Sequence, residues 1–192
     1  MSEEDRQRWN TRYRAQARAR EPSSFLRSLA ERLPASGRAL DVAGGAGQDA
    51  LWLAGRGLDV TLVDISDVAL EQAAEAARQA GVSLQLQRVD VEHEPLPAGP
   101  YALVHCQGFL SRPLFAAFAQ VLAPGGLLVF AQPTRSNLER NAHPSARFLL
   151  EDQELPRLLQ GLDILSYTEG WTEEGRHEAR LVATPRPAPA SR

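Results

Sequence analysis

A glycine-rich run is the part of the sequence whose residues are most clearly suited to binding a ligand. Residues 39–47 read Ala-Leu-Asp-Val-Ala-Gly-Gly-Ala-Gly, between a predicted strand at 38–42 and a predicted helix from about residue 48. Small residues let the backbone turn sharply and let a ligand approach the main chain. The unpaired N–H groups that begin the helix can bind an amino-acid carboxylate or a phosphate. Such a turn also fits a purely structural connection, so the residues at the ends of the next strands are needed to distinguish a binding site from a structural turn.

Two acids stand at the ends of the next two predicted strands. Asp64 follows the strand at 59–63, where a carboxylate can accept hydrogen bonds from both hydroxyls of a ribose. Asp90 follows the third strand, where it could accept the exocyclic amine of adenine while Val91 donates its N–H to the ring. Asp64 could instead cap the next helix or be a solvated strand end, and Asp90 could be a turn residue. We expect the Asp64 strand end to be solvent-accessible before ligand binds.

A nicotinamide enzyme is the main alternative, because residues 45–50 also fit the pattern G-x-G-x-x-A. Asp41 argues against it, since this carboxylate lies inside the turn and would repel a pyrophosphate. The same carboxylate suits a ligand that carries a sulfonium and an ammonium.

The elements needed to position these residues alternate between strand and helix patterns, which predicts an α/β fold with a doubly wound, mostly parallel sheet of seven strands. Two final strands at 164–169 and 178–183 follow each other without a helix, which predicts a C-terminal antiparallel hairpin rather than a standard dinucleotide fold. We expect one domain over residues 1–184, with N-terminal helices at 1–34, a cofactor-binding core at 35–184 and a disordered tail at 185–192.

Composition excludes several chemistries. All 21 basic residues are arginine, so no lysine can form a Schiff base or serve a phosphate-binding loop. The single Cys106 excludes an intramolecular disulfide, and the four histidines are far apart in sequence, so no metal site is expected. The net charge of −3 favours neither a nucleic-acid nor a membrane surface, and the six arginines of the first 20 residues fit a solvated helix face. No secretory or membrane-spanning stretch is apparent, so a cytoplasmic protein is expected.

Residues 41–47 resemble the first motif, D-x-G-x-G-x-G, of class I S-adenosylmethionine-dependent methyltransferases, with Ala43 in place of the first glycine. More narrowly, the chain resembles small bacterial tellurite-resistance-type methyltransferases. This likeness rests on Trp9-x-x-Arg12-Tyr13, Ala50-Leu51-Trp52-Leu53-Ala54, Arg112-Pro113-Leu114-Phe115 and Ala123-Pro124-Gly125-Gly126.

The resemblance implies a fold and a cofactor, S-adenosyl-L-methionine, but not an acceptor. It implies that the methionine part, the ribose and the adenine are each held by a different group of residues. Asp41, Ala43, Gly45 and Gly47 would hold the methionine part, with Tyr13 folding over it. Asp64 and Ile65 would hold the ribose, Asp90 and Val91 the adenine, and Gln107 would close over the adenosine.

Methyl transfer needs alignment and exclusion of water more than a catalytic cluster. His143, in a predicted long loop at 133–147, is the best candidate for a general base, although a histidine in such a place is more often an ordinary loop residue. We expect this loop and the N-terminal helix to form a mobile lid over a small-molecule acceptor. A protein that kept the fold but lost catalysis is the alternative.

Overall fold

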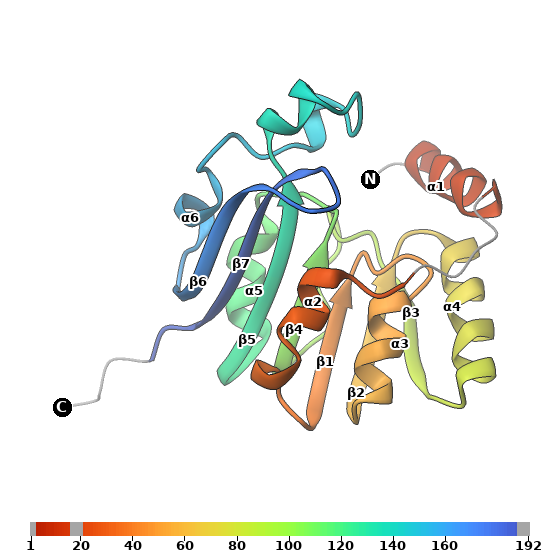
Figure 1. Ribbon diagram of the computed structural model, residues 1–192. Helices are drawn as coiled ribbons and strands as arrows, with labels where there is room; N and C mark the ends of the chain where they lie inside the picture. The colour runs from red at the N-terminus through yellow and green to blue at the C-terminus, as the bar shows by residue number, and fades with distance from the viewer. Residues whose placement is uncertain (1–2, 16–20, 188–192) are drawn as a thin grey trace.

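The computed structural model describes residues 3–15 and 21–187 (Figure 1). Helices and strands alternate through most of the chain, as expected. The α-helices are α1 (Glu3–Ala15), α2 (Ser24–Ser28), α3 (Gln48–Gly55), α4 (Asp67–Ala80), α5 (Leu114–Val121) and α6 (Leu155–Leu158). The strands are β1 (Gly37–Val42), β2 (Leu58–Asp64), β3 (Leu84–Arg88), β4 (Tyr101–Gln107), β5 (Leu122–Pro133), β6 (Leu162–Trp171) and β7 (His177–Pro185). Three 3-10 turns complete this part of the chain: η1 (Ala30–Arg32), η2 (Arg135–Glu139) and η3 (Ala146–Phe148).

The strands of the described residues form one sheet in the order β3-β2-β1-β4-β5-β7-β6. The first five pair in parallel, whereas β7 runs antiparallel between β5 and β6. The predicted fold class and terminal hairpin are therefore confirmed. The carboxyl ends of β1 and β4 are neighbours at the centre of the sheet, where the chain reverses its direction of winding, and such a point is where open α/β sheets bind ligands.

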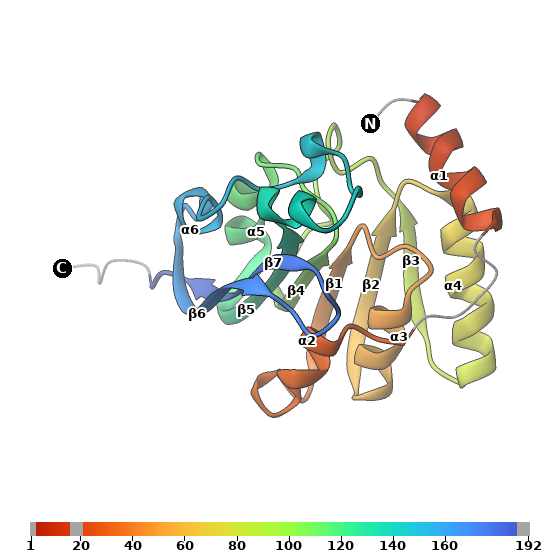
Figure 2. The same ribbon diagram turned by 45° about the horizontal axis from the view of Figure 1, so that its top comes forward.

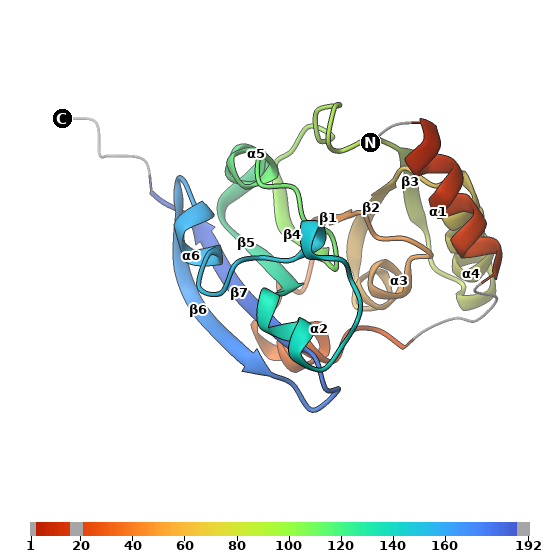
Figure 3. The ribbon, with the colours of Figure 1, turned by 90° about the horizontal axis from the view of Figure 1, so that it is seen from above.

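Helices cover both faces of the sheet, so side chains alternate between two apolar cores (Figure 3). Phe115 and Phe118 of α5 pack on one face, with Cys106 of β4. Leu26 of α2 and Leu53 of α3 pack on the other. Cys106 is buried, and burial raises the pKa of its thiol.

Local signals explain the helix that follows the second strand. Ser66 accepts a hydrogen bond from the N–H of Ala69 at 3.1 Å and so caps α4. Gly81 ends the same helix with a φ of 67°, a conformation that glycine adopts without strain.

Two expectations about the C-terminal half need correction. The stretch at 133–147 is not a structureless loop, because it contains η2 and the buried Asn137, and Thr134 pairs with Leu150. The tail does not begin at Pro185, since this residue ends β7 and the N–H of Arg186 donates to the carbonyl of Gly161 at 2.9 Å. The remaining residues of the predicted tail, 188–192, lie outside the described residues.

No helix within the described part of the chain is long and apolar enough to cross a membrane.

Candidate cofactor site

The glycine turn joins β1 to α3 in a tightly folded left-handed path. Ala43, Gly45 and Gly47 have φ values of 53°, 58° and 83°. The N–H of Gly44 donates to the carbonyl of Val63 at 3.2 Å, which ties the turn to β2. Ala43 therefore keeps the left-handed conformation in which glycine is favoured, and its methyl group makes this position strained.

Asp64 supports the turn from the end of β2. Its two carboxylate oxygens accept the N–H of Gly45 at 2.9 Å and the N–H of Ser66 at 2.8 Å. The residue is only 6% exposed, so the expectation of a solvent-accessible strand end is wrong. Burial raises the pKa of Asp64, while the two backbone hydrogen bonds oppose that rise.

A second acid, Asp41, meets His105 across the sheet. The two residues are register partners in β1 and β4, so their side chains lie side by side on the face that α3 covers. Asp41 Oδ1 lies 2.8 Å from His105 Nδ1, and both residues are buried. Asp49 of α3 lies on the other side of the ring, its Oδ2 4.0 Å from His105 Nε2.

Several buried polar atoms at this edge have no hydrogen-bond partner. Among the described residues they include Asp41 Oδ2, His105 Nε2 and Gln107 Oε1, from the carboxyl ends of β1 and β4. Buried polar groups are normally paired, so unpaired ones at a ligand-binding edge fit a bound polar ligand. A carboxylate oxygen and an amide oxygen both accept hydrogen bonds, which suits a ligand rich in hydroxyl, amine or ammonium groups.

Asp90 and Val91 follow β3 along the same edge. Val91 is buried, while Asp90 is partly exposed and interacts with His93 at 2.9 Å. The Asp90 carboxylate also accepts the N–H of Glu92 at 3.1 Å. Ligand atoms of Asp90, Glu92 and His93 lie within 4.8 Å of one another, an arrangement that exposed acidic groups commonly adopt without an ion.

Helix α1 reaches the turn through Tyr13 and Asn10. A Cβ atom added to Gly45 would stand 2.3 Å from the hydroxyl of Tyr13, so this hydroxyl lies directly against the turn. Asn10 is buried and its Oδ1 accepts the hydroxyl of Ser66 at 2.7 Å and the N–H of Val68 at 3.3 Å. Because Ser66 also donates its N–H to Asp64, α1 is connected to the acid that supports the turn.

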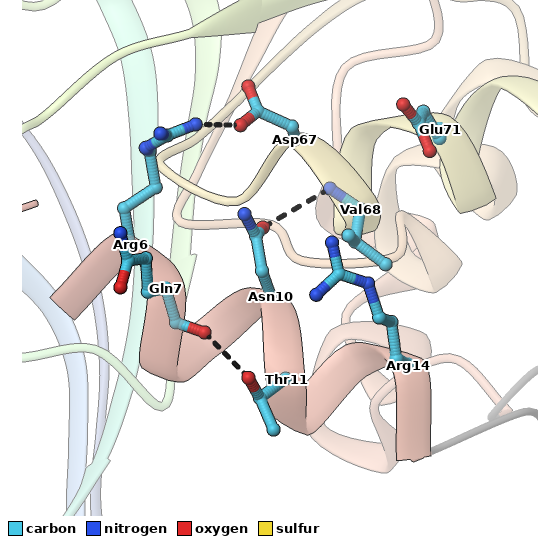
Figure 4. A pocket seen from close by; sticks show the side chains of 8 residues that line it. All are labelled: Arg6, Gln7, Asn10, Thr11, Arg14, Asp67, Val68 and Glu71. Carbon is cyan, nitrogen blue, oxygen red and sulfur yellow. Dashed lines mark hydrogen bonds and ion pairs between the residues drawn. The ribbon is translucent and has the colours of Figure 1, made fainter. Parts of the chain in front are cut away.

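A polar groove of about 600 Å³ lies between α1 and α4 (Figure 4). Its lining includes Arg6, which forms an ion pair with Asp67, and Arg14. The groove is lined by helix side chains rather than by the glycine turn, so it borders the candidate site without being its centre.

His143, the candidate base, lies between η2 and η3 with an exposed side chain. Its carbonyl accepts the amide of Asn137 at 3.0 Å, which anchors the backbone there. Figures 1 and 2 show this segment and α1 on the same side of the sheet, above the carboxyl ends of the parallel strands.

Sequence reasoning missed three members of this site. His105 meets both Asp41 and Asp49 only because the register of β1 and β4 and the start of α3 bring them together. Asn10 lies on α1 between Trp9 and Tyr13, the aromatic residues that carry part of the family resemblance. Nothing in the sequence around Asn10 predicted that this residue is buried. The available signal was the spacing along β4: His105 is two residues from the apolar Leu103 and therefore lies on the same face of the strand, the face that packs against α3.

Comparisons with known proteins agree with this arrangement. Residues 39–126 match a family model described as a methyltransferase domain. The S-adenosyl-L-methionine-dependent Diels-Alderase iccD of Talaromyces variabilis is 31% identical over 158 residues, covering 76% of this chain and 50% of that protein. The tRNA 5-carboxymethoxyuridine methyltransferase of Escherichia coli K12 is 34% identical over 110 residues, covering 53% of this chain and 42% of that protein.

The fold is also shared with solved structures. TehB from Haemophilus influenzae superposes with a TM-score of 0.74 at 16% identity, covering 93% of this chain and 67% of that one. The chain spans about half the length of the curated relatives it matches. Residues 39–126 of the chain are thus similar to methyltransferase domains, and its seven-stranded sheet has the fold of the superposed structure.

Proposed function

We propose that the chain binds S-adenosyl-L-methionine at the carboxyl edge of β1, β2 and β4 and transfers its methyl group to a small-molecule acceptor. The observation that carries this proposal is the pair of buried acids around a left-handed glycine turn, one of which, Asp41, has an unpaired oxygen. When bound, the cofactor supplies a methyl group activated by a positively charged sulfur.

The chain's own residues would bind and orient this ligand. Each Asp64 oxygen accepts one backbone N–H and keeps a lone pair for a ribose hydroxyl, and Ile65 lies beside it. The free oxygen of Asp41 would attract the ammonium of the methionine part, which the turn at Ala43, Gly45 and Gly47 would cradle. Charge-assisted hydrogen bonds of this kind are the strong ones in a buried site.

The remaining contacts would enclose the nucleoside. Asp90 and Val91 would bind adenine through a carboxylate and a backbone N–H, as their position after β3 suggests. Gln107 would offer its unpaired amide oxygen from the end of β4. Tyr13 would cover the methionine end, because its hydroxyl already lies against Gly45.

Electrostatics disfavours a nicotinamide dinucleotide. Asp41, Asp49 and Asp64 place three carboxylates around the turn and the first turn of α3, where a pyrophosphate would have to bind. Like charges in a partly buried site repel, so a cationic ligand fits better than a dianionic one.

The small-molecule class of acceptor rests on the charges of α1. Of the four arginines in the described part of that helix, Arg6 pairs with Asp67 and Arg8 with Asp5, while Arg12 stacks over Trp9 at 5.0 Å and Arg14 lines the polar groove. Paired arginines contribute less to phosphate binding than unpaired ones. The match to a tRNA methyltransferase nevertheless makes RNA the second acceptor to test.

Transfer of a labelled methyl group tests the proposal. The purified chain is incubated with methyl-labelled cofactor and a panel of phenols, carboxylic acids, thiols and bulk tRNA, and both S-adenosylhomocysteine and labelled product are measured. We expect label in a small molecule, and its loss in Asp64→Asn. Label in tRNA would show that the acceptor is an RNA rather than a small molecule. Binding of the cofactor without any methyl transfer would favour a non-methylating role, like the Diels-Alderase activity named for the Talaromyces relative.

A further inference from the structure

The histidine beneath the glycine turn is buried in an unusual position for a titratable base. His105 is only 2% exposed and lies on the sheet face that α3 covers. Its Nδ1 is 2.8 Å from Asp41 Oδ1, while its Nε2 is buried, has no hydrogen-bond partner and lies 4.0 Å from Asp49 Oδ2. A base held between two carboxylates is suited to carry a proton and a positive charge.

The balance of forces on this ring favours the charged form. Burial alone lowers the pKa of His105, but the hydrogen bond and charge of Asp41, the charge of Asp49 and the side chain of Gln107 together outweigh it and raise the pKa. Burial also raises the pKa of Asp49, against the opposing charge of His105. The imidazolium thus lies between two carboxylates, 2.8 Å from Asp41 and 4.0 Å from Asp49.

The titratable neighbours come from each element packed around the ring. Asp41 comes from β1 and Asp49 from α3, whereas the thiol of Cys106 points to the opposite face of β4. The Tyr13 hydroxyl lies above the turn at Gly45. Within residues 3–15 and 21–187, His105 is the histidine that lies between these acids.

This arrangement leaves Asp41 with one oxygen engaged by His105 and one without a partner. The unpaired oxygen is where the proposed function puts the ammonium of the cofactor. A cation there would lie on the far side of the same small carboxylate from the imidazolium, and two positive charges that share one carboxylate repel each other.

We infer that His105 is a positioning residue of the cofactor site, which holds the Asp41 carboxylate in the free protein and releases its proton to the solvent when a cationic ligand pairs with that carboxylate. This inference rests on the proposed cofactor binding. It makes the site exchange one positive charge for another, so that ligand affinity rises with pH across the range in which His105 titrates in the free protein.

Calorimetry with S-adenosylhomocysteine, which carries the same ammonium group, tests the inference without turnover. Titrations at pH 7.5 in phosphate and in Tris, buffers of different ionisation enthalpy, give the number of protons released. We expect release of up to about one proton per bound ligand, and an affinity that rises by up to about tenfold per pH unit. His105→Asn keeps a donor for Asp41 but cannot titrate, so it should bind with no proton release and a flat pH profile. The matched control His143→Asn, at an exposed site, should release as many protons as the wild type.

Nuclear magnetic resonance of histidine-labelled wild-type protein provides a second measurement that needs no variant. The His105 ring should titrate above the ordinary histidine range in the free protein, and ligand should lower its midpoint on the order of one to two pH units. Binding with an unchanged His105 midpoint, or equal proton release from His105→Asn, would overturn the inference alone. Failure of the ligand to bind at all would overturn the proposed function and this inference together.

Discussion

Replacement of Gly47 by alanine tests the glycine turn, because two different costs meet at this residue. Gly47 has a φ of 83° and begins α3, with its carbonyl accepting the N–H of Leu51 at 2.8 Å. An added Cβ would lie 2.9 Å from the Cβ of Ala73 and 3.1 Å from Leu62. Both neighbours are fully buried, so neither can move aside freely.

Gly81 provides the matched control, because it pays only one of these costs. It has a φ of 67° at the end of α4, and an added Cβ would meet nothing within 4 Å. Alanine in the left-handed conformation lowers the free energy of unfolding by about 1–2 kcal/mol. Roughly 0.4–1 kcal/mol of this loss is offset, because alanine makes the unfolded chain less flexible than glycine does. Gly81→Ala should therefore lose about 1 kcal/mol.

Gly47→Ala should lose more, because overpacking adds about 1–3 kcal/mol to the same backbone strain. The total of roughly 2–4 kcal/mol corresponds to a fall in Tm of roughly 4–16 °C for a domain of this size. The free energy of unfolding is measured by urea denaturation and Tm by circular dichroism. Gly81→Ala should keep the affinity for S-adenosylhomocysteine, and Gly47→Ala should weaken it. Equal stability losses in the two variants would refute the claim that the turn is packed tightly against α4.

Three further changes probe the acids and the N-terminal helix. Asp64→Asn replaces one of the two oxygens that accept backbone N–H groups by an amide nitrogen, which donates instead. It should lose about 1.5–3 kcal/mol of stability, measured by denaturation, and bind the ligand about tenfold or more weakly, measured by calorimetry. Normal stability would mean that these two hydrogen bonds do not stabilise the fold. Asn10→Ala leaves the Ser66 hydroxyl without its acceptor and should speed amide exchange in α1. The hydroxyl of Thr11 donates to a carbonyl within α1, so Thr11→Ala should not change the exchange. Unchanged exchange in Asn10→Ala would mean that other contacts hold α1 in place. Because its folded-state pKa is raised, protonated His105 stabilises the fold below about pH 6.5, and this contribution is lost as the pH rises through that raised pKa. His105→Asn should therefore flatten the decline in the free energy of unfolding above about pH 6.5, and a parallel decline in both proteins would contradict this prediction.

The order of elements could be predicted from sequence because each depends on local signals. Ser66 and Gly81 mark the two ends of α4 by their own chemistry, and the directly joined final strands require an antiparallel pair. The position of Asp64 at a strand end followed from the same local pattern.

The interior of the site could not be predicted, because it depends on register. Asp41 and His105 are 64 positions apart and meet only when β1 and β4 pair in one particular alignment. The burial of Asp64 likewise depends on Gly45 folding back over β2, so a residue that looked exposed at a strand end is buried. Asn10 shows the same limit for α1, since its partners lie on α4.

Equilibrium titration of the purified chain with S-adenosylhomocysteine and, separately, with NAD tests the central claim most directly. The site predicts micromolar binding of S-adenosylhomocysteine, with a stabilisation of about 2.7 kcal/mol at a ligand concentration of about 100 times Kd. It predicts no binding of NAD, because carboxylates surround the turn where its pyrophosphate would lie. Binding of NAD with no response to S-adenosylhomocysteine would contradict the account.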